Sequence, residues 1–334
     1  MKSTIKAAVL ACSTLLLAGV AQAQIKMKIS SATVNDPTQE WARAFTAGVD
    51  ARSGGKIKIE FYPAGQLGPI PATVEGTALG TIEAVSVASG FFVGLEPRFL
   101  VFDAPGLFED FDFNARLFND PAIRERLSGF GKSKGVESIA FITVTPLYVL
   151  SHKPIRTISD LAGQKIRTPG GAPLHLEPLR KASASPLSMP LGEVLPAMQT
   201  KSIDGVIAGL SAFTTFKFYD VAKALTAVPG TVIVSPVLVN SAFLKSLGPE
   251  LEKIVREEAT KAELATVPWA KREIVNGLDV WKKNGGEIIA LSADEQKKYL
   301  DIVAGVVPTI FASTPGFKED YEAIVATGKR LRAQ

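Results

Sequence analysis

The alternation of strand and helix is clearest in residues 25–62, which have the sequence IKMKISSATVNDPTQEWARAFTAGVDARSGGKIKIEFY. Residues 25–31 and 56–62 are short β-rich runs, and the apolar residues of segment 38–52 recur at helical spacing. The buried face of that helix is expected to comprise Trp41, Phe45 and Val49. The Ser-Gly-Gly that follows is a helix stop, so the stretch predicts a strand, a helix and a second strand.

The same alternation continues along the chain. We expect a helix at residues 70–79 and a third strand at 81–88, an order that indicates a parallel sheet covered by helices. The pattern returns after residue 138. The strands expected there are 138–151, 164–168, 187–190 and 202–207, and the helices are 158–162, 173–182 and 193–200. With 334 residues at about 150 per domain, the chain is predicted to contain two α/β units.

Two further segments have a distinct character. Residues 97–117 are dense in phenylalanine, which favours core packing over a ligand cage. The tail is helical: residues 249–283 form either one long helix or two with a joint near Pro268, and residues 292–312 form another that Ser292 and Asp294 begin.

The first 23 residues are typical of a signal peptide. Lys2 and Lys6 precede an apolar stretch, and residues 21–23 have the small-x-small pattern of a cleavage site. We therefore expect cleavage after Ala23 and export. A membrane anchor is the alternative, but the stretch of about 14 apolar residues is short of the roughly 20 that span a bilayer. Lipidation at Cys12 is a second alternative.

The composition excludes several kinds of partner and chemistry. The net charge is +4 and no basic block occurs, which disfavours nucleic acid. Cys12 is the only cysteine, and no later run is long and apolar enough to span a membrane. His152 and His175 lack acidic partners at metal-ligand spacing and are expected to lie on the surface. We predict no metal, no cofactor and no catalytic residue, since nucleotide-binding glycine motifs and a G-x-S-x-G elbow are also missing.

Ligands of open α/β sheets bind outside the carboxyl ends of the strands. The loops expected at that edge are residues 31–36, 89–92, 168–172 and 208–213. Arg167 ends a short strand just before Pro169 and Gly170, so it is expected to face the interdomain crevice. Its guanidinium fork matches a carboxylate in a bidentate manner, although a structural ion pair would place an arginine there equally well.

Several motifs occur in a fixed order between about residues 25 and 315. They are Gly54-Gly55-Lys56, Tyr62-Pro63-Ala64-Gly65-Gln66-Leu67-Gly68, Lys153-Pro154-Ile155, the run from Asp160 to Gly170, Pro190-Leu191-Gly192-Glu193-Val194, and Ala197-Met198-Gln199-Thr200 before Asp204-Gly205. By these motifs the chain resembles the DctP-type solute-binding proteins of TRAP (tripartite ATP-independent periplasmic) transporters.

The resemblance implies a two-domain, periplasmic-binding-protein-like (type II-like) α/β fold with crossing strands and a long hinge helix. It also implies a periplasmic receptor that closes on a small organic acid, holds its carboxylate with Arg167 and delivers it to a membrane permease. The expected domains are residues 24–146 with about 236–268, residues 147–235, and C-terminal helices at about 269–334 that span the hinge and pack on the second domain.

The chain departs from the family pattern at four matched positions. Leu147 replaces a frequent second arginine, Ala208 a frequent asparagine, Leu191 an aromatic residue, and Ala88 an acidic residue. Because polar groups are lost, we expect a monocarboxylate with an apolar or aromatic body. The candidate ligand-binding residues are Arg167, Ser31, Asn35, Ser89, Gly90, Leu147, Tyr148, Leu191, Ala208 and Phe213, although the spacing of Phe213 and Phe216 is more often that of core residues.

Two other functions remain open from the sequence. A receptor that feeds a sensor kinase would have the same chain, and an exported enzyme acting on small acids could use the same fold. The missing base and nucleophile count against the enzyme.

Overall fold

The computed structural model describes residues 24–104, 106–108 and 110–334. Their strands form one nine-stranded sheet in the order β2-β1-β3-β8-β4-β7-β5-β6, with β9 paired to β8. The strands are β1 (Ile25–Ser31), β2 (Ile57–Tyr62), β3 (Ala84–Ser86), β4 (Val136–Ser151), β5 (Lys165–Thr168), β6 (Ser185–Ser188), β7 (Gly205–Gly209), β8 (Ala224–Asn240) and β9 (Glu287–Ile289). The expected signal peptide lies outside the described residues.

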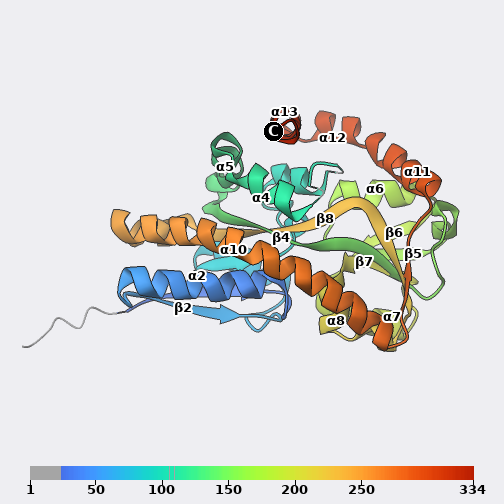
Figure 1. The fold of residues 1–334 in the computed structure, drawn as a ribbon, viewed down its shortest axis with the longest axis horizontal. Helices are drawn as coiled ribbons and strands as arrows, with labels where there is room; N and C mark the ends of the chain where they lie inside the picture. Colours follow the sequence, from blue (N-terminus) through green and yellow to red (C-terminus); the bar gives the residue numbers. More distant parts are fainter. Residues whose placement is uncertain (1–23, 105, 109) are drawn as a thin grey trace, which may run out of the picture.

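Helices cover both faces of this sheet (Figure 1). The α-helices are α2 (Pro37–Ser53), α3 (Ile70–Leu79), α4 (Phe111–Asn119), α5 (Pro121–Ser128), α6 (Pro173–Lys181), α7 (Leu191–Gln199), α8 (Leu210–Thr215), α9 (Ser241–Ser246), α10 (Gly248–Lys283), α11 (Ala293–Ala304), α12 (Val307–Ser313) and α13 (Phe317–Arg332). The 3-10 helices are η2 (Ser89–Phe91), η3 (Pro97–Asp103), η4 (Lys132–Lys134), η5 (Ile158–Leu161) and η6 (Phe218–Asp220).

The first lobe is built on β1, β2 and β3, which pair in parallel as the sequence predicts. Asp36 caps α2 by accepting a hydrogen bond from the Gln39 amide, and Gly54 ends the helix in the left-handed conformation. The apolar face of α2 is fully buried against Met27 and Ile29 of β1. The strand expected at 81–88 is shorter, because only β3 pairs and the chain then turns into η2.

The phenylalanine-rich segment belongs to the core of the first lobe. Phe99, Phe102 and Phe108 are almost completely buried, and Phe102 stacks on Phe108 and on Phe141 of β4. This confirms the expectation that the segment packs rather than forming a cage.

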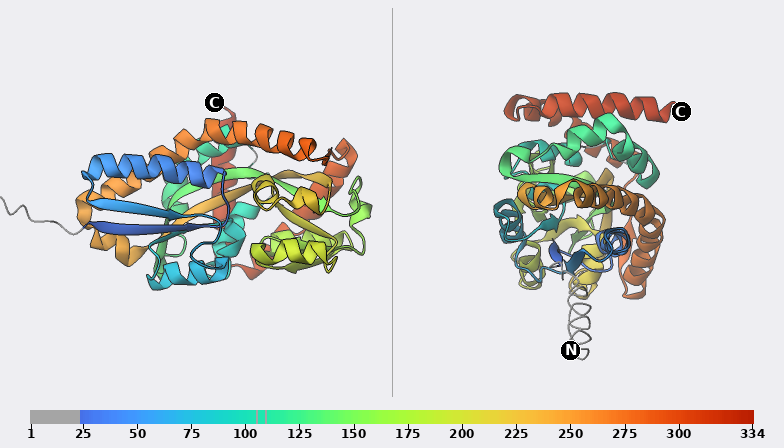
Figure 2. Two further views of the ribbon diagram at one scale, coloured as in Figure 1. Left: turned by 90° about the horizontal axis from the view of Figure 1, so that it is seen from below. Right: turned by 90° about the vertical axis from the view of Figure 1, so that its left-hand side faces the viewer.

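The second lobe is built on β5, β6 and β7, with parallel pairing of β5 to both neighbours. Helices α6, α7 and α8 follow β5, β6 and β7 in turn. Figure 2 shows the two lobes side by side, with β4 and β8 passing from one to the other. These two strands span 16 and 17 residues and pair with each other antiparallel, with three register shifts between them.

Helix α10 runs along both lobes as one helix of 36 residues with Pro268 inside it, so no joint divides it. It packs on α2 and β4 of the first lobe and on α8 of the second. The crossing strands and the long helix confirm the expected fold class. The residue boundaries of the domains stay a prediction, since 146 and 235 fall inside β4 and β8.

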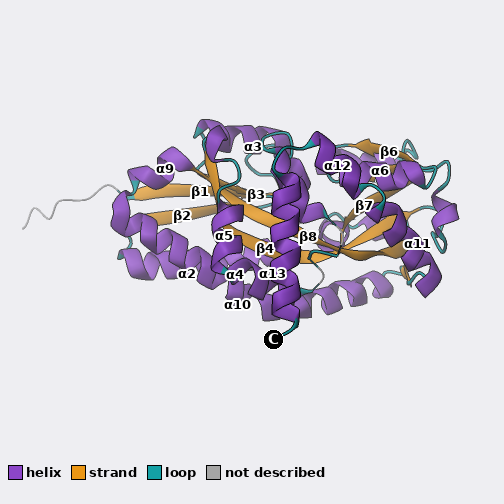
Figure 3. Cartoon of the chain, turned by 90° about the horizontal axis from the view of Figure 1, so that it is seen from above, coloured by secondary structure: helices purple, strands orange, loops and turns teal. Residues whose placement is uncertain are grey.

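The C-terminal helices bridge the lobes from another side (Figure 3). The single helix expected at 292–312 is wrong: α11 ends before Gly305, and α12 begins at Val307. Helix α11 packs on α6 of the second lobe, whereas α13 packs on η3, α4 and α5 of the first. There the buried Asp320 accepts hydrogen bonds from Arg98 and Arg126, which tie α13 to the first lobe.

Candidate ligand-binding site

A pocket lies between the two lobes at the carboxyl ends of their strands, where the loops were expected to meet. Centres of water molecules can occupy a volume of about 70 Å³ in this pocket. Its walls are formed by Ala32, Thr33, Asp36, Thr38, Ile70, Ser86, Val87, Ala88 and Phe91 on the first-lobe side, Arg167, Pro169, Leu191, Ala208, Gly209, Ser211 and Ala212 on the second-lobe side, and Val144, Ile233 and Ser235 on the crossing strands.

Arg167 is the only lysine or arginine on these walls, and its side chain is 1% exposed. Its Nε and Nη2 donate to the carbonyl of Met189 at 3.0 and 2.8 Å, and its Nη1 lies 3.3 Å from the carbonyl of Ile207. Among the described residues no carboxylate pairs with it, which excludes a structural ion pair there. Burial lowers the pKa of Arg167 to about 9, because the guanidinium has lost its water without gaining an anion.

An acidic side chain shares the pocket. Asp36 is 2% exposed and accepts hydrogen bonds from the Thr33 hydroxyl and the Gln39 amide. Desolvation raises the pKa of Asp36 above its ordinary value, and these hydrogen bonds oppose the rise. The pocket thus places a buried cation on the second lobe and a buried carboxyl on the first.

Hydroxyl groups and apolar surface complete the walls. The Oγ of Ser86 is buried without a hydrogen-bond partner, and Ser211 and Ser235 also face the pocket. Apolar side chains outnumber these groups, with Leu191, Ala208 and Phe91 among them. The arrangement can hold one carboxylate firmly, one or two weaker hydrogen-bonding groups, and a compact hydrocarbon body.

Of the ten expected residues, the structure brings three together on these walls: Arg167, Leu191 and Ala208. Asn35 lines a neighbouring cavity instead. Ser31 and Ser89 are buried, and their hydroxyls donate to the Thr33 carbonyl and to Asp103.

The other four expected residues do not lie on the pocket walls. Gly90 touches Pro169 of the opposite lobe. Leu147 and Tyr148 point to the two cores of the second lobe, since successive residues of a strand face opposite sides. Phe213 is completely buried against Phe218 and Trp281, which is the core position that the sequence left open.

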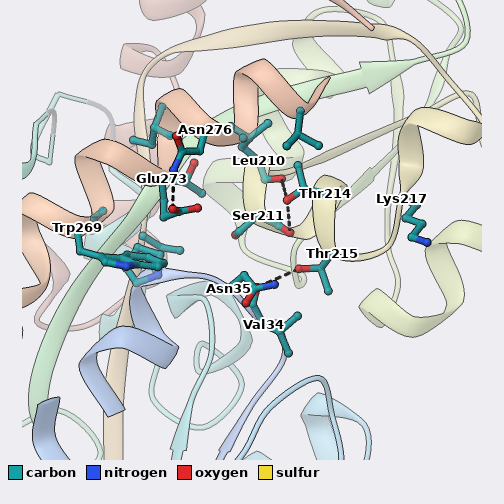
Figure 4. Close-up of a pocket in the computed structure, with 17 residues that line it drawn as sticks. Val34, Asn35, Leu210, Ser211, Thr214, Thr215, Lys217, Trp269, Glu273 and Asn276 are labelled. Atoms are coloured by element: carbon teal, nitrogen blue, oxygen red, sulfur yellow. Dashed lines mark hydrogen bonds between the residues drawn. The ribbon is translucent and has the colours of Figure 1, made fainter. Parts of the chain in front are cut away.

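The neighbouring cavity has a volume of about 520 Å³ and is lined by the loop before α2, by α8 and by α10. Figure 4 shows Trp269, Glu273 and Asn276 on α10 facing Val34 and Asn35 across it. The Thr215 hydroxyl donates to the Val34 carbonyl at 3.1 Å, which joins the lobes beside this cavity. Val144 and Ser211 line both cavities, so the neighbouring cavity, which we call the outer cavity, adjoins the pocket of Arg167.

Sequence reasoning missed several residues of the pocket. Thr33, Asp36, Phe91, Pro169 and Ser211 lie in loops that were expected to form the site, but no residue type singled them out. In the sequence Asp36 looks like an ordinary helix cap, and nothing in that pattern indicates that it also lines the pocket.

His175 is not a surface residue as expected. Its side chain is 10% exposed, and its Nε2 lies 3.4 Å from Asp103, which also accepts a hydrogen bond from Ser89. Ser89 therefore donates to the carboxylate and not to the imidazole, so the trio does not form the serine–histidine contact of a hydrolase. Within residues 24–104, 106–108 and 110–334 no group of three metal-ligating side chains could hold a metal ion. Over the same ranges no helix has the length and apolarity to cross a bilayer.

Comparison with protein families adds a match over most of the chain. The model of the bacterial extracellular solute-binding protein family 7, DctP, matches residues 29–314. The chain is 27% identical over 274 residues to the 2,3-diketo-L-gulonate-binding periplasmic protein YiaO of Escherichia coli (strain K12), with 81% of each protein covered. It is 26% identical over 313 residues to the ectoine/5-hydroxyectoine-binding periplasmic protein UehA of Ruegeria pomeroyi, covering 92% of this chain and 91% of that one.

A solved structure shows the same fold. The TRAP periplasmic solute binding protein from Desulfovibrio salexigens, with bound orotic acid, has a TM-score of 0.84 at 24% identity, and the match covers 91% of this chain and 100% of that one. The likeness therefore extends over both lobes and the elements that join them.

Proposed function

Because the chain belongs to family 7 of the bacterial extracellular solute-binding proteins, we propose that its pocket captures a small monocarboxylate whose carboxyl group Arg167 holds. The chain is a solute-binding protein of the TRAP periplasmic type, and members of this family are receptors rather than enzymes. The observation that carries the ligand proposal is the buried guanidinium of Arg167, which faces an interlobe pocket without an acidic partner.

The carboxylate of the ligand replaces the hydrogen bonds to water that Arg167 loses on burial. A guanidinium that has lost its water gains charge-assisted hydrogen bonds from a bidentate anion, each worth about 1.5–3 kcal/mol. A second carboxylate on the ligand would find no second cation on these walls and would face Asp36 instead. Burying an unpaired charge costs several kcal/mol, so a monocarboxylate is favoured over a diacid.

The rest of the pocket limits the body of the ligand. Centres of water molecules can occupy about 70 Å³ of the pocket, which is room for several waters and hence for a small acid. Leu191, Phe91 and Ala208 favour hydrocarbon, at about 25 cal/mol per Å² of apolar surface buried. The unpartnered hydroxyl of Ser86 supports one hydroxyl or carbonyl group on the ligand, on the side of the first lobe.

The route of the ligand follows from the family. We place the mature receptor in the periplasm after removal of residues 1–23, where it would deliver the acid to a TRAP membrane permease. The relatives reported above bind a keto sugar acid, ectoine and orotic acid, so a compact organic acid is within the range of the fold.

Thermal melting of residues 24–334 with a panel of acids tests the proposal. The panel comprises isobutyrate, pantoate, benzoate, orotate, succinate and D-glucuronate. A ligand at 100 times its Kd stabilises the protein by about 2.7 kcal/mol, so we expect a clear rise in Tm with at least one monocarboxylate. The rise should vanish in Arg167→Met and persist in Arg180→Met, which removes an exposed arginine of the same lobe.

Other outcomes would count against parts of the proposal. If succinate alone raised the Tm, the monocarboxylate argument would be wrong while the receptor would stand. If the bound acid were chemically converted during incubation, the protein would be an exported enzyme. Capture of a sensor-kinase ectodomain in place of a permease by the ligand-loaded protein would support the signalling alternative.

A further inference from the structure

The lobes also touch each other at a second contact, away from the one made by Thr215 and Val34. In the first lobe, the Ser89 hydroxyl of η2 donates to Oδ1 of Asp103, at the end of η3, at 2.9 Å. In the second lobe, His175 in the first turn of α6 places its Nε2 3.4 Å from the same oxygen. The Asp103 and His175 side chains are only 8% and 10% exposed, so water reaches this contact poorly.

The backbones of the two lobes approach as closely as glycine permits. A Cβ on Gly170 would lie 2.6 Å from the carbonyl oxygen of Gly90, and a Cβ on Gly90 would lie 2.8 Å from that of Pro169. Real Cβ atoms do not come so near to a backbone oxygen. The segments at 89–90 and 169–170 therefore meet through bare backbone, directly after the strand that carries Arg167.

Apolar packing surrounds this contact. Ala172 and Leu174 at the start of α6 are 0% and 2% exposed, and they belong to the phenylalanine-rich core of the first lobe. A segment of the second lobe thus contributes to the core of the first. These contacts exist only while the lobes are together, because their residues belong to different lobes.

Asp103 depends on this closed arrangement for its partner. Burial raises the pKa of the Asp103 carboxyl, while the neighbouring His175 and the Ser89 hydroxyl oppose the rise. The second carboxylate oxygen and Nδ1 of His175 have no partner among the described residues, so the pair at Oδ1 is the link between the two side chains. Separation of the lobes would break that link and expose both groups to water.

We propose that Asp103 and His175 form an interlobe latch, with Ser89 orienting the carboxylate, and that this latch stabilises the closed receptor around its ligand. None of the three residues lines the pocket of Arg167, so these are positioning residues: they change affinity by changing how much of the protein is closed. A ligand that binds only the closed form has an apparent Kd inversely proportional to the closed fraction.

The fraction of closed molecules can be measured without knowing the ligand. Residues 24–334 contain no cysteine, so Leu79→Cys on α3 and Gln199→Cys on α7 provide two exposed labelling positions, one on each lobe. Single-molecule energy transfer between the two dyes then reports the distance between the lobes. The measurement is made in the unliganded protein and again with saturating pantoate.

We expect His175→Ala and Asp103→Asn each to lower the closed-to-open ratio by about tenfold, equivalent to about 1.4 kcal/mol. The double variant should lose little more than either single one, since both remove the same contact. The matched control is His152→Ala, because His152 contacts Met198 within the second lobe and crosses no interface. Equal distributions in wild type, His175→Ala and Asp103→Asn would overturn the latch.

Separate controls distinguish a loss of the latch from a folding defect and from a wrong choice of ligand. Each variant is melted without ligand, and a Tm near the wild-type value shows that the lobes themselves are intact. His175→Gln, which keeps a hydrogen-bond donor of similar size, should recover part of the closed fraction. The latch concerns closure over the acid proposed above, but failure of pantoate to shift the wild-type distribution would reject only that ligand.

Discussion

Two charged side chains of opposite sign define the pocket at the scale of single residues. Arg167 and Asp36 are both almost fully buried on its walls, and neither forms an ion pair among the described residues. A folded protein keeps such groups at a cost to its stability, since each would be better solvated outside. The site therefore holds two charged groups without ion-pair partners, and a ligand can supply the missing partner.

Asp36→Asn tests that cost. The folded-state pKa of Asp36 is raised, so between its ordinary value near 3.8 and the raised value the folded protein binds more protons than the unfolded chain. The free energy of unfolding contributed by this group is thus lost as pH rises through that window. Asparagine keeps the helix cap without the charge. We expect the variant to have a Tm above wild type at pH 7, and the difference should disappear near pH 4. Each kcal/mol of added stability should raise the Tm by about 2–4 °C.

Melting curves of wild type and Asp36→Asn from pH 3.5 to 8 provide the measurement. Asp120→Asn is the matched control, because Asp120 also caps a helix but pairs with Arg330, which lowers its pKa. That control should lose stability at pH 7. A Tm of Asp36→Asn below wild type throughout would mean that the charged form is stabilised in the fold.

At the scale of elements, the sequence identifies the regular parts well and the irregular ones poorly. The three parallel strands of the first lobe and α2 follow from periodicity and caps alone. Strand β8 was missed because Pro229, Gly230 and Pro236 are typical of turns. Pro229 and Gly230 fall in the register shift between Ala227 and Val232, whereas Pro236 pairs in register with Phe141 of β4. Helix α10 likewise accommodates Pro268, which is exposed to solvent.

The site was predictable in position but not in composition. Strand ends and the Arg167 motif locate the crevice, because parallel strands place their carboxyl ends at one edge. Ser86 and Ser235 have no signal in the sequence, since a serine on a buried strand looks the same whether it faces a core or a pocket. Asp103 and His175 are 72 positions apart, and only the closing of the two lobes brings them together.

A glycine-to-alanine substitution tests the close contact between the η2 segment and the loop before α6. Gly170 has φ +77°, and a Cβ there would lie 2.6 Å from the Gly90 carbonyl oxygen. Gly163 has φ +74° with nothing within 4 Å of its Cβ position. Alanine costs about 1–2 kcal/mol of left-handed strain at either site, but only Gly170→Ala obstructs closure.

We therefore expect Gly170→Ala and Gly163→Ala to lower the Tm of the unliganded protein by similar amounts. Calorimetric titration with the acid that raises the wild-type Tm should show at least about a tenfold loss of affinity for Gly170→Ala alone. Equal affinities in the two variants would show that the lobes do not meet at this point in the ligand-bound protein.

For the whole molecule, closure joins the lobes at two separate contacts. At one, the Thr215 hydroxyl of α8 donates to the Val34 carbonyl, and at the other Asp103 meets His175. The crossing strands and α10 keep the lobes connected throughout, so opening must break these two contacts while preserving the connections. The receptor is thus expected to close by a hinge motion that forms both interlobe contacts.

Trp269 offers a reporter of this motion. Trp41 and Trp281 are completely buried, whereas Trp269 is partly exposed on the wall of the outer cavity, which both lobes and α10 enclose. When the lobes separate, the loop at Val34 and Asn35 withdraws from α8, and more water reaches the indole. Binding of the acid should therefore shift the emission to shorter wavelength and reduce quenching by acrylamide. The chain has three tryptophans, so the response of one of them is a large part of the signal.

The shift should disappear in Trp269→Phe while the affinity measured by calorimetry stays within about threefold, because Trp269 does not line the pocket of Arg167. In His175→Ala the same shift should require more ligand, since a smaller closed fraction raises the apparent Kd. An unchanged emission spectrum on saturation of the wild type would mean that the outer cavity keeps its shape. Closure would then occur without movement of the first-lobe loop against α8.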